Sequence, residues 1–160
     1  MRIGFDAKRA FHNFRGLGNF SRTLIDGLTQ YYPESKYFLY TPPVKDKRGL
    51  EFEKMIMDKT EIRTPQTKIG QLSPSLWRSM LLSEDLKKDG LDIYHGLSHE
   101  LPPKIDKLDC KSIVTMHDVI FMRHPEFFPL VDRLVYKKKF SYSCKVADRV
   151  IAICEQTKRD

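Results

Sequence analysis

The sequence predicts an α/β fold, a Rossmann-like parallel sheet flanked by helices. Segments with strand character alternate with segments of helical periodicity, which favours parallel strands joined by crossover helices. The chain has 160 residues, of which 41% are hydrophobic and 31% are charged, and this composition suits one globular domain with a sizeable core. We therefore expect a single domain over residues 1–160.

The N-terminal segment predicts a strand, a loop and a helix. Arg2–Asp6 is the first strand and Ala7–Gly18 a long loop. Residues from about Asn19 to Tyr32 predict a helix, with Asn19 as its N-cap and Pro33 just beyond its end. Its apolar stripe at helical spacing consists of Phe20, Leu24, Leu28 and Tyr31.

Two further strands are predicted before the middle of the chain. Lys36–Thr41 is rich in aromatic residues and is followed by two prolines, which end it. Glu61–Thr64 predicts a short strand. Between them, Val44–Met57 is charged and mixed, and we assign it no regular structure.

A second clear helix is predicted to begin at Ser73. Serine is a favoured N-cap residue, and Pro74 occupies the first helical position. Lys87 and Lys88 lie in the last turn and Gly90 stands just beyond it, which is the expected chemistry of a helix end.

The C-terminal part repeats the alternation. Leu91–His95, Ser112–Met116 and Arg149–Ile153 predict strands, and Leu130–Ala147 predicts a helix. Glu155–Asp160 resembles the first turn of another helix, so we expect this domain to belong to a longer protein.

The chain is basic, with a formal net charge of +7 and a pI near 9.3. Basic chains favour nucleic acid, anionic lipid headgroups or phosphorylated small molecules, and charge does not choose among them. The run Lys137–Lys139 is not interleaved with base-stacking aromatic residues, so we expect a solvated helix face and no nucleic-acid partner.

The cysteines and the apolar runs bear on the cellular compartment. The three cysteines, Cys110, Cys144 and Cys154, are widely spaced and form no Cys-x-x-Cys, which argues against a disulfide framework or a zinc site. No segment approaches the roughly 18 apolar residues of a membrane span, and we expect no signal peptide. These features predict a cytoplasmic protein.

A glycine-rich segment is the first candidate binding element. Gly16, Leu17, Gly18 and Asn19 precede the first predicted helix, where glycine lets the backbone approach a ligand and the helix N-terminus offers free N–H groups. Ser21 stands where a dinucleotide-binding fingerprint would have its third glycine. A turn that needs positive φ is an equally open explanation.

Two histidine motifs lie at predicted strand ends, where parallel sheets bind ligands. His95 and Gly96 close one strand, and His95 is either a substrate contact or a structural histidine. His117 and Asp118 close the next strand and suit the orientation of a hydroxyl for proton transfer; the alternative is that they cap the following turn. His99 has no helical partner and favours a structural role, and we predict no metal site.

Taken in order, these motifs resemble a known family. The resemblance rests on Asp6-Ala7 and the segments Gly16–Phe20, Asp92–Gly96, Val114–Val119 and Ala147–Ile153. The chain is similar over nearly its whole length to the N-terminal domain of group 1 (family four) GT-B glycosyltransferases, which resemble mannosyltransferases. Cys154 departs from the family, which commonly has serine there.

The resemblance implies two Rossmann-like domains facing across a cleft, no metal and no cofactor. The N-terminal domain binds a saccharide or lipid-linked acceptor, and the C-terminal domain binds the nucleotide-sugar donor. Gly16 and Gly18 would lie near the donor diphosphate and the acceptor, His117 would be the cleft histidine, and Asp118 its neighbour. Expected products are cell-surface polysaccharide or glycolipid, such as lipopolysaccharide. Without the second domain, we expect no transferase activity.

Two other functions stay open at this point. One is a nucleotide-sugar epimerase of the same two-domain shape. The other is a non-catalytic module that binds polyanions or membranes through the basic surface. Peripheral membrane contact through the helix from Ser73 to Lys88, with Trp77 as its anchor, is compatible with the transferase as well.

Overall fold

The computed structural model describes residues 1–160, with the side chains of all residues except Ile69 and Ser75. Its centre is a sheet of six strands in the order β3-β2-β1-β4-β5-β6, and every neighbouring pair is parallel. The strands are β1 (Arg2–Asp6), β2 (Lys36–Tyr40), β3 (Glu61–Arg63), β4 (Ile93–Gly96), β5 (Lys111–Met116) and β6 (Arg149–Ala152). The predicted α/β, Rossmann-like fold is confirmed.

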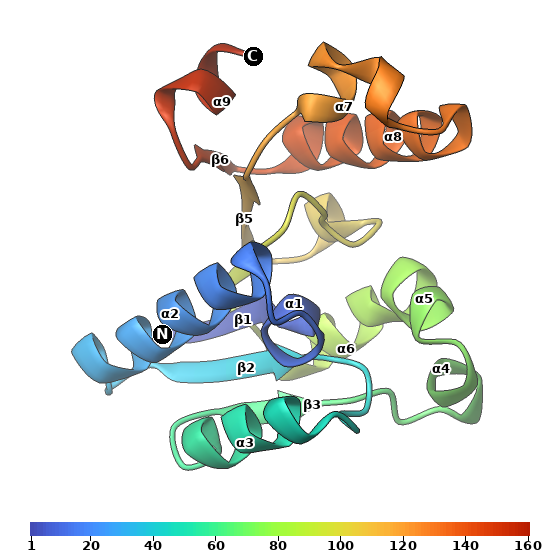
Figure 1. The fold of residues 1–160 in the computed structure, drawn as a ribbon. Helices are drawn as coiled ribbons and strands as arrows, with labels where there is room; N and C mark the ends of the chain where they lie inside the picture. The colour runs from blue at the N-terminus through green and yellow to red at the C-terminus, as the bar shows by residue number, and fades with distance from the viewer.

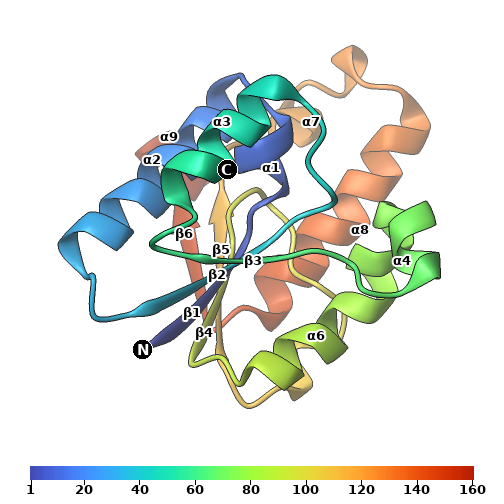
Figure 2. The same ribbon diagram turned by 90° about the horizontal axis from the view of Figure 1, so that it is seen from below.

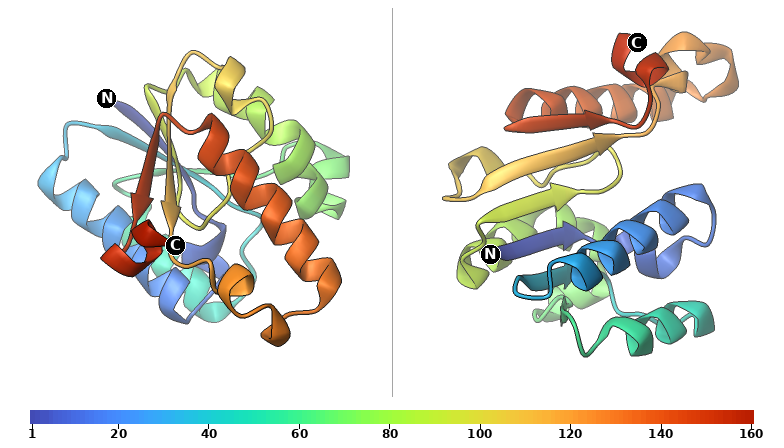
Figure 3. Two further views of the ribbon diagram at one scale, coloured as in Figure 1. Left: turned by 90° about the horizontal axis from the view of Figure 1, so that it is seen from above. Right: turned by 90° about the vertical axis from the view of Figure 1, so that its left-hand side faces the viewer.

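Helices cover both faces of this sheet (Figure 1). The helical elements are α1 (Lys8–His12), α2 (Gly16–Tyr31), α3 (Lys47–Ile56), α4 (Lys68–Leu72), α5 (Pro74–Leu76), η1 (Trp77–Leu81), α6 (Leu82–Asp89), η2 (Ile105–Lys107), α7 (Ile120–Arg123), η3 (Pro125–Phe127), α8 (Leu130–Val146) and α9 (Glu155–Arg159). Figures 2 and 3 show α1, α2 and α3 on one face, and α6 and α8 on the other. None of the helices described is both long and apolar enough to cross a bilayer.

Strand β2 shows how the two hydrophobic cores arise. Successive side chains of a strand point to opposite faces. Tyr37 and Leu39 belong to the cluster beneath α1, α2 and α3, whereas Phe38 and Tyr40 belong to the cluster beneath α6 and α8. All four are at most 2% exposed, and full burial of a side chain of this size contributes roughly 1.5–3 kcal/mol.

The predicted loop Ala7–Gly18 is wrong, because it contains α1 and the start of α2. Ala7, Ala10 and Phe11 are fully buried, and their spacing places them on one helical face. The N-cap of α2 is Arg15, so the prediction of Asn19 as N-cap is also wrong. Helix α1 has only five residues, too few for its periodicity to be recognised in the sequence. Burial of its apolar face against the core stabilises it.

Helix α3 occupies the segment to which the sequence assigned no regular structure. Asp46 is its N-cap, and its carboxylate accepts a hydrogen bond of 2.9 Å from the Arg48 amide. Phe52 and Ile56, one turn apart, are buried against the sheet. The cap residue was the usable signal for this helix.

The helix predicted from Ser73 exists but is not uniform. α5, η1 and α6 follow one another without a break, and η1 is a π-helical turn that rotates the following side chains. Ser73 is the N-cap by position, although its side chain makes no capping bond. Gly90 ends α6 with φ of 55°, as its residue type predicted.

Trp77 is 1% exposed, and its indole N–H donates to Asp85 at 2.8 Å. This burial rules out Trp77 as the membrane anchor that the sequence suggested.

Candidate functional site

The carboxyl ends of the parallel strands form the edge where α/β sheets bind ligands. β1 lies at the centre of the strand order; the chain leaves it towards β2 and returns to its other side at β4. The point of reversal is therefore between β1 and β4. Asp6 ends β1, and His99 and Glu100 lie in the loop after β4.

His117 follows β5 at this edge and is half-buried. Its Nε2 lies 2.9 Å from the carbonyl oxygen of Leu97. Since a carbonyl only accepts, Nε2 carries the hydrogen in the neutral ring, and Nδ1 is the acceptor. Among the described residues, the buried side-chain atoms without a partner are Arg78 Nε and Tyr94 Oη, so His117 Nδ1 is not sealed inside the protein. The ring can therefore accept a hydrogen bond from a ligand hydroxyl.

The same ring packs against the helix that opens with the glycine segment. The Phe20 ring meets the His117 ring edge-on, with 4.7 Å between centroids. Two motifs far apart in the sequence thus lie side by side at the carboxyl edge.

His99 fixes the turn that carries His117 and Asp118. Its Nε2 accepts from the amide of His117 at 3.1 Å and from that of Asp118 at 3.4 Å, and its ring stacks on Phe140 with 4.5 Å between centroids. Burial lowers the pKa of His99 to about 4, and the nearby His117 contributes a smaller part of this shift. The ring is therefore neutral at neutral pH, and its Nε2 can accept hydrogen bonds. Its φ of 67° is left-handed, a strained conformation for histidine. The structural role expected for His99 matches this placement.

Asp118 engages the following turn through one oxygen. Its Oδ1 accepts a bond of 3.2 Å from the amide of Ile120, which begins α7. This bond closes the turn that leads into α7, whose N-cap residue is Val119, and it fits the turn-capping role that the sequence left open as the alternative to a catalytic role.

The glycine segment has two parts with different roles. Nothing lies within 4 Å of where a Cβ on Gly16 would stand, whereas a Cβ on Gly18 would stand 1.6 Å from the carbonyl oxygen of Asn13. Gly18 is therefore required by close approach of the chain to itself. The first helical hydrogen bond of α2 runs from the amide of Asn19 to the carbonyl oxygen of Arg15, at 2.9 Å. The amides of Gly16–Gly18 precede it and have no carbonyl partner in the preceding turn. The unpaired amides at this helix N-terminus are therefore those of Gly16, Leu17 and Gly18, of which Gly18 is buried.

Asn19 and Leu17 lie within the first turn of α2. The Asn19 side chain is exposed and accepts from Arg22 at 2.6 Å, while Leu17 is half-buried. Neither is engaged in capping the helix.

His95 lies inside the sheet and is 6% exposed. Its Nε2 is 2.8 Å from Thr115 Oγ1, and burial lowers its pKa to about 4. This placement fits a structural histidine, the alternative left open by the sequence. Gly96 is a packing requirement as well, because a Cβ there would lie 2.2 Å from the carbonyl oxygen of Glu100.

An ion network on the other face escaped the sequence prediction. Arg78, from the π-helical turn, donates to the Asp6 carboxylate and lies 3.7 Å from Glu100, which accepts from Lys139 at 3.1 Å. Asp6 and Arg78 side chains are only 5% and 17% exposed. The sequence offered one signal for this network, the carboxylate of Asp6 at the end of the central strand. Nothing in the sequence pairs Arg78 with Asp6.

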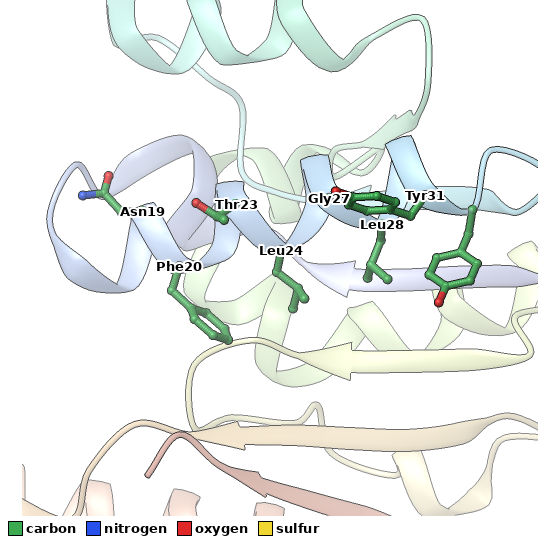
Figure 4. A pocket seen from close by; sticks show the side chains of 8 residues that line it. Asn19, Phe20, Thr23, Leu24, Gly27, Leu28 and Tyr31 are labelled. Atoms are coloured by element: carbon green, nitrogen blue, oxygen red, sulfur yellow. The ribbon is translucent and has the colours of Figure 1, made fainter.

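The apolar stripe predicted for the first helix is only partly in the core: Leu24 and Leu28 are partly buried against the cluster beneath α2. The buried residues of α2 are Gly18, Ser21, Ile25 and Thr29. The stripe also lines an open groove of about 730 Å³, and Tyr31 is 81% exposed. Figure 4 shows Phe20, Leu24 and Leu28 on one side of α2. The groove therefore starts beside His117 and runs along the helix.

No protein-family model and no curated protein matches this chain. Within the described residues, no three histidine, cysteine or acidic side chains gather in a metal-binding group.

Proposed function

We propose that this chain is the N-terminal, acceptor-side domain of a retaining, metal-independent GT-B glycosyltransferase. It would act in the cytosol on a nucleotide-sugar donor and a saccharide or lipid-linked acceptor, in the synthesis of cell-surface polysaccharide or glycolipid. The observation that carries the proposal is the contact between Phe20 and His117, because it joins the glycine-rich helix start to the strand-end histidine. The motif resemblance supplies the reaction class.

His117 would orient the reacting groups. Its Nε2 is held by the Leu97 carbonyl, so Nδ1 is available to a hydroxyl of the sugar or acceptor. The free amides of Gly16–Gly18 lie at the N-terminus of a long helix, which favours an anionic group such as a diphosphate. Transfer would occur on the face from which the diphosphate leaves, with donor phosphates held by a second domain.

The test compares His117→Ala with His124→Ala in the polypeptide that carries this domain together with the proposed donor domain. His124 is a matched control because it is an exposed histidine of the same region, and its ring contacts Glu126 and Phe127. Sugar transfer from a panel of nucleotide sugars is measured, with unfolding followed in parallel. We expect His117→Ala to lower kcat by about 10²-fold or more and His124→Ala to leave it unchanged.

Equal kcat per folded molecule for the two variants would contradict the assignment of His117. Product analysis separates the rival chemistry, since an epimerase changes the sugar of the donor without extending an acceptor. The 160-residue chain by itself should turn over no nucleotide sugar, because the groups that stabilise the leaving diphosphate belong to the proposed second domain.

A further inference from the structure

Helix α8 has an outward side that is both apolar and basic. The helix packs on the sheet through its other side, where the Phe140 ring stacks on His99 and Ser143 Oγ accepts from the Leu101 amide at 2.9 Å. We call the outward side of α8, together with the neighbouring side chain of η3, the α8 surface. Its large apolar members, between 43% and 71% exposed, are Phe127, Leu130, Val131, Leu134 and Val135.

Aromatic contacts hold the elements that carry the α8 surface together. The Phe121 ring, from α7, meets the rings of Tyr136 and Phe140 edge-on, with centroids 5.7 and 5.2 Å away. The Phe128 ring, just after η3, meets Tyr136 edge-on at 6.4 Å. Figure 1 shows α7 beside α8. These rings fill the space beneath α8, and the leucines, the valines and Phe127 are left outside it.

Apolar and basic side chains follow one another along α8. The two leucines are one helical turn apart, and so are the two valines, so all four lie along the first turns on the outward side. Lys137 and Lys138 come in the next turn. Between residues 120 and 146 there are six lysine or arginine residues and two acidic ones. In the part of the chain that the structure describes, Lys139 pairs with Glu100, whereas Lys137 and Lys138 form no ion pair.

The combination of charge and apolar surface selects among possible partners. Large apolar side chains exposed together indicate a binding surface. A second copy of this chain, related by a twofold axis, would bring the lysines of both copies together, and they would repel. Nucleic acid offers phosphates to the lysines but no apolar region to the leucines and valines. A bilayer that contains anionic lipids offers both.

We propose that the α8 surface binds a membrane surface that contains anionic lipids. The apolar side chains at the start of α8 enter the headgroup region, and Lys137 and Lys138 contact lipid phosphates. The net charge of +7 adds attraction at longer range. The contact lies on a different helix from the one that carries Trp77, which is buried. The proposal does not depend on the transfer reaction, because it concerns binding of this chain to lipid.

The test is co-sedimentation of the 160-residue chain with two kinds of vesicle, phosphatidylcholine alone and phosphatidylcholine mixed with phosphatidylglycerol. We expect binding to the mixed vesicles that weakens as salt is added, and binding to the neutral vesicles that is at least about tenfold weaker. Lys137→Gln/Lys138→Gln should weaken binding to the mixed vesicles about 25-fold, because each lysine near an anionic membrane contributes roughly fivefold. Leu130→Ser/Leu134→Ser should weaken it about tenfold or more, because it removes apolar contact.

Helix α3 supplies matched controls, since it lies towards the other edge of the sheet from α8 (Figure 1). Lys47→Gln/Lys54→Gln removes the same charge from two exposed lysines. Leu50→Ser/Met55→Ser removes apolar side chains that are 40% and 56% exposed. Both control variants should bind the mixed vesicles within about twofold of the parent chain. All four variants change exposed side chains, so each should keep the urea midpoint of the parent chain.

Three results would overturn the proposal: no binding to the mixed vesicles, α8 variants that bind as well as the parent chain, or α3 variants that lose as much affinity as the α8 variants. Loss of binding in the lysine variant, with Leu130→Ser/Leu134→Ser unaffected, would also contradict it, because the surface would then bind polyanions without entering a bilayer. A parent chain that is dimeric in analytical ultracentrifugation, with a monomeric Leu130→Ser/Leu134→Ser variant, would assign the surface to a second copy instead.

Discussion

Replacing Asp6 by asparagine tests whether the buried ion network at the central strand stabilises the fold. The substitution keeps the size of the side chain and removes its charge. Arg78 would remain as a largely buried cation, with Glu100 at 3.7 Å as its other carboxylate. Removing one partner of a buried pair typically costs 3–5 kcal/mol, because the remaining charge is uncompensated. Since Glu100 stays in place, we expect a loss near the lower limit, about 3 kcal/mol.

Urea unfolding followed by circular dichroism measures this loss. With a slope of about 2 kcal/mol per molar urea for a chain of this size, the midpoint should fall by about 1.5 M. Glu61→Gln is the matched control, because it removes one carboxylate from an arginine pair whose side chains are 49% and 34% exposed. Exposed pairs contribute about 1 kcal/mol or less, so its midpoint should move far less.

Double-mutant analysis completes the test. In Asp6→Asn/Arg78→Met no uncompensated cation remains, so the double variant should be at least as stable as Asp6→Asn alone. Equal midpoint shifts for Asp6→Asn and Glu61→Gln would refute the reasoning, because they would show that burial adds nothing to this pair.

Three further outcomes follow from the packing. Gly18→Ala should destabilise the chain by roughly 2 kcal/mol or more, because its new Cβ would overlap a backbone carbonyl, whereas Gly16→Ala should be neutral or stabilise it slightly in the same urea assay. Burial lowers the pKa of both His95 and His99 from 6.5 to about 4, so unfolding takes up protons between these values. Stability should therefore be retained above pH 6.5 and fall as the pH drops towards 4, by roughly 3 kcal/mol per histidine, and His95→Gln should flatten that fall. Hydrogen bonds from Thr157 lower the pKa of the Cys154 thiol, so Cys154 should be the first cysteine alkylated by iodoacetamide at neutral pH, as mass spectrometry would show.

Local pattern was sufficient for most of the sheet. The strands near Arg2, Lys36, Ser112 and Arg149 were predicted within a residue or two, because each is a compact apolar run bounded by turn residues. Gly90 was also predictable, since a left-handed helix end favours glycine. Helix α1 was missed because a single turn has too few residues for a period to be recognised.

The candidate site was likewise predictable from the sequence only in part. Position at a strand end made His117 a candidate from the sequence alone. The Leu97 carbonyl that sets its tautomer and the His99 ring that accepts from its amide were visible only in the structure. The interpretation of Gly18 also needed the structure, because its close neighbour Asn13 approaches only once α1 has folded.

The sequence by itself determined the fold class, since alternating strand and helix periodicities leave a parallel sheet as the way to bury both kinds of apolar face. Tertiary structure alone decided which polar groups meet at its carboxyl edge. Asp6 and Arg78 are 72 residues apart and lie on elements that are not consecutive. Their contact depends on the strand order and on the rotation of side chains at the π-helical turn, and neither leaves a local trace in the sequence.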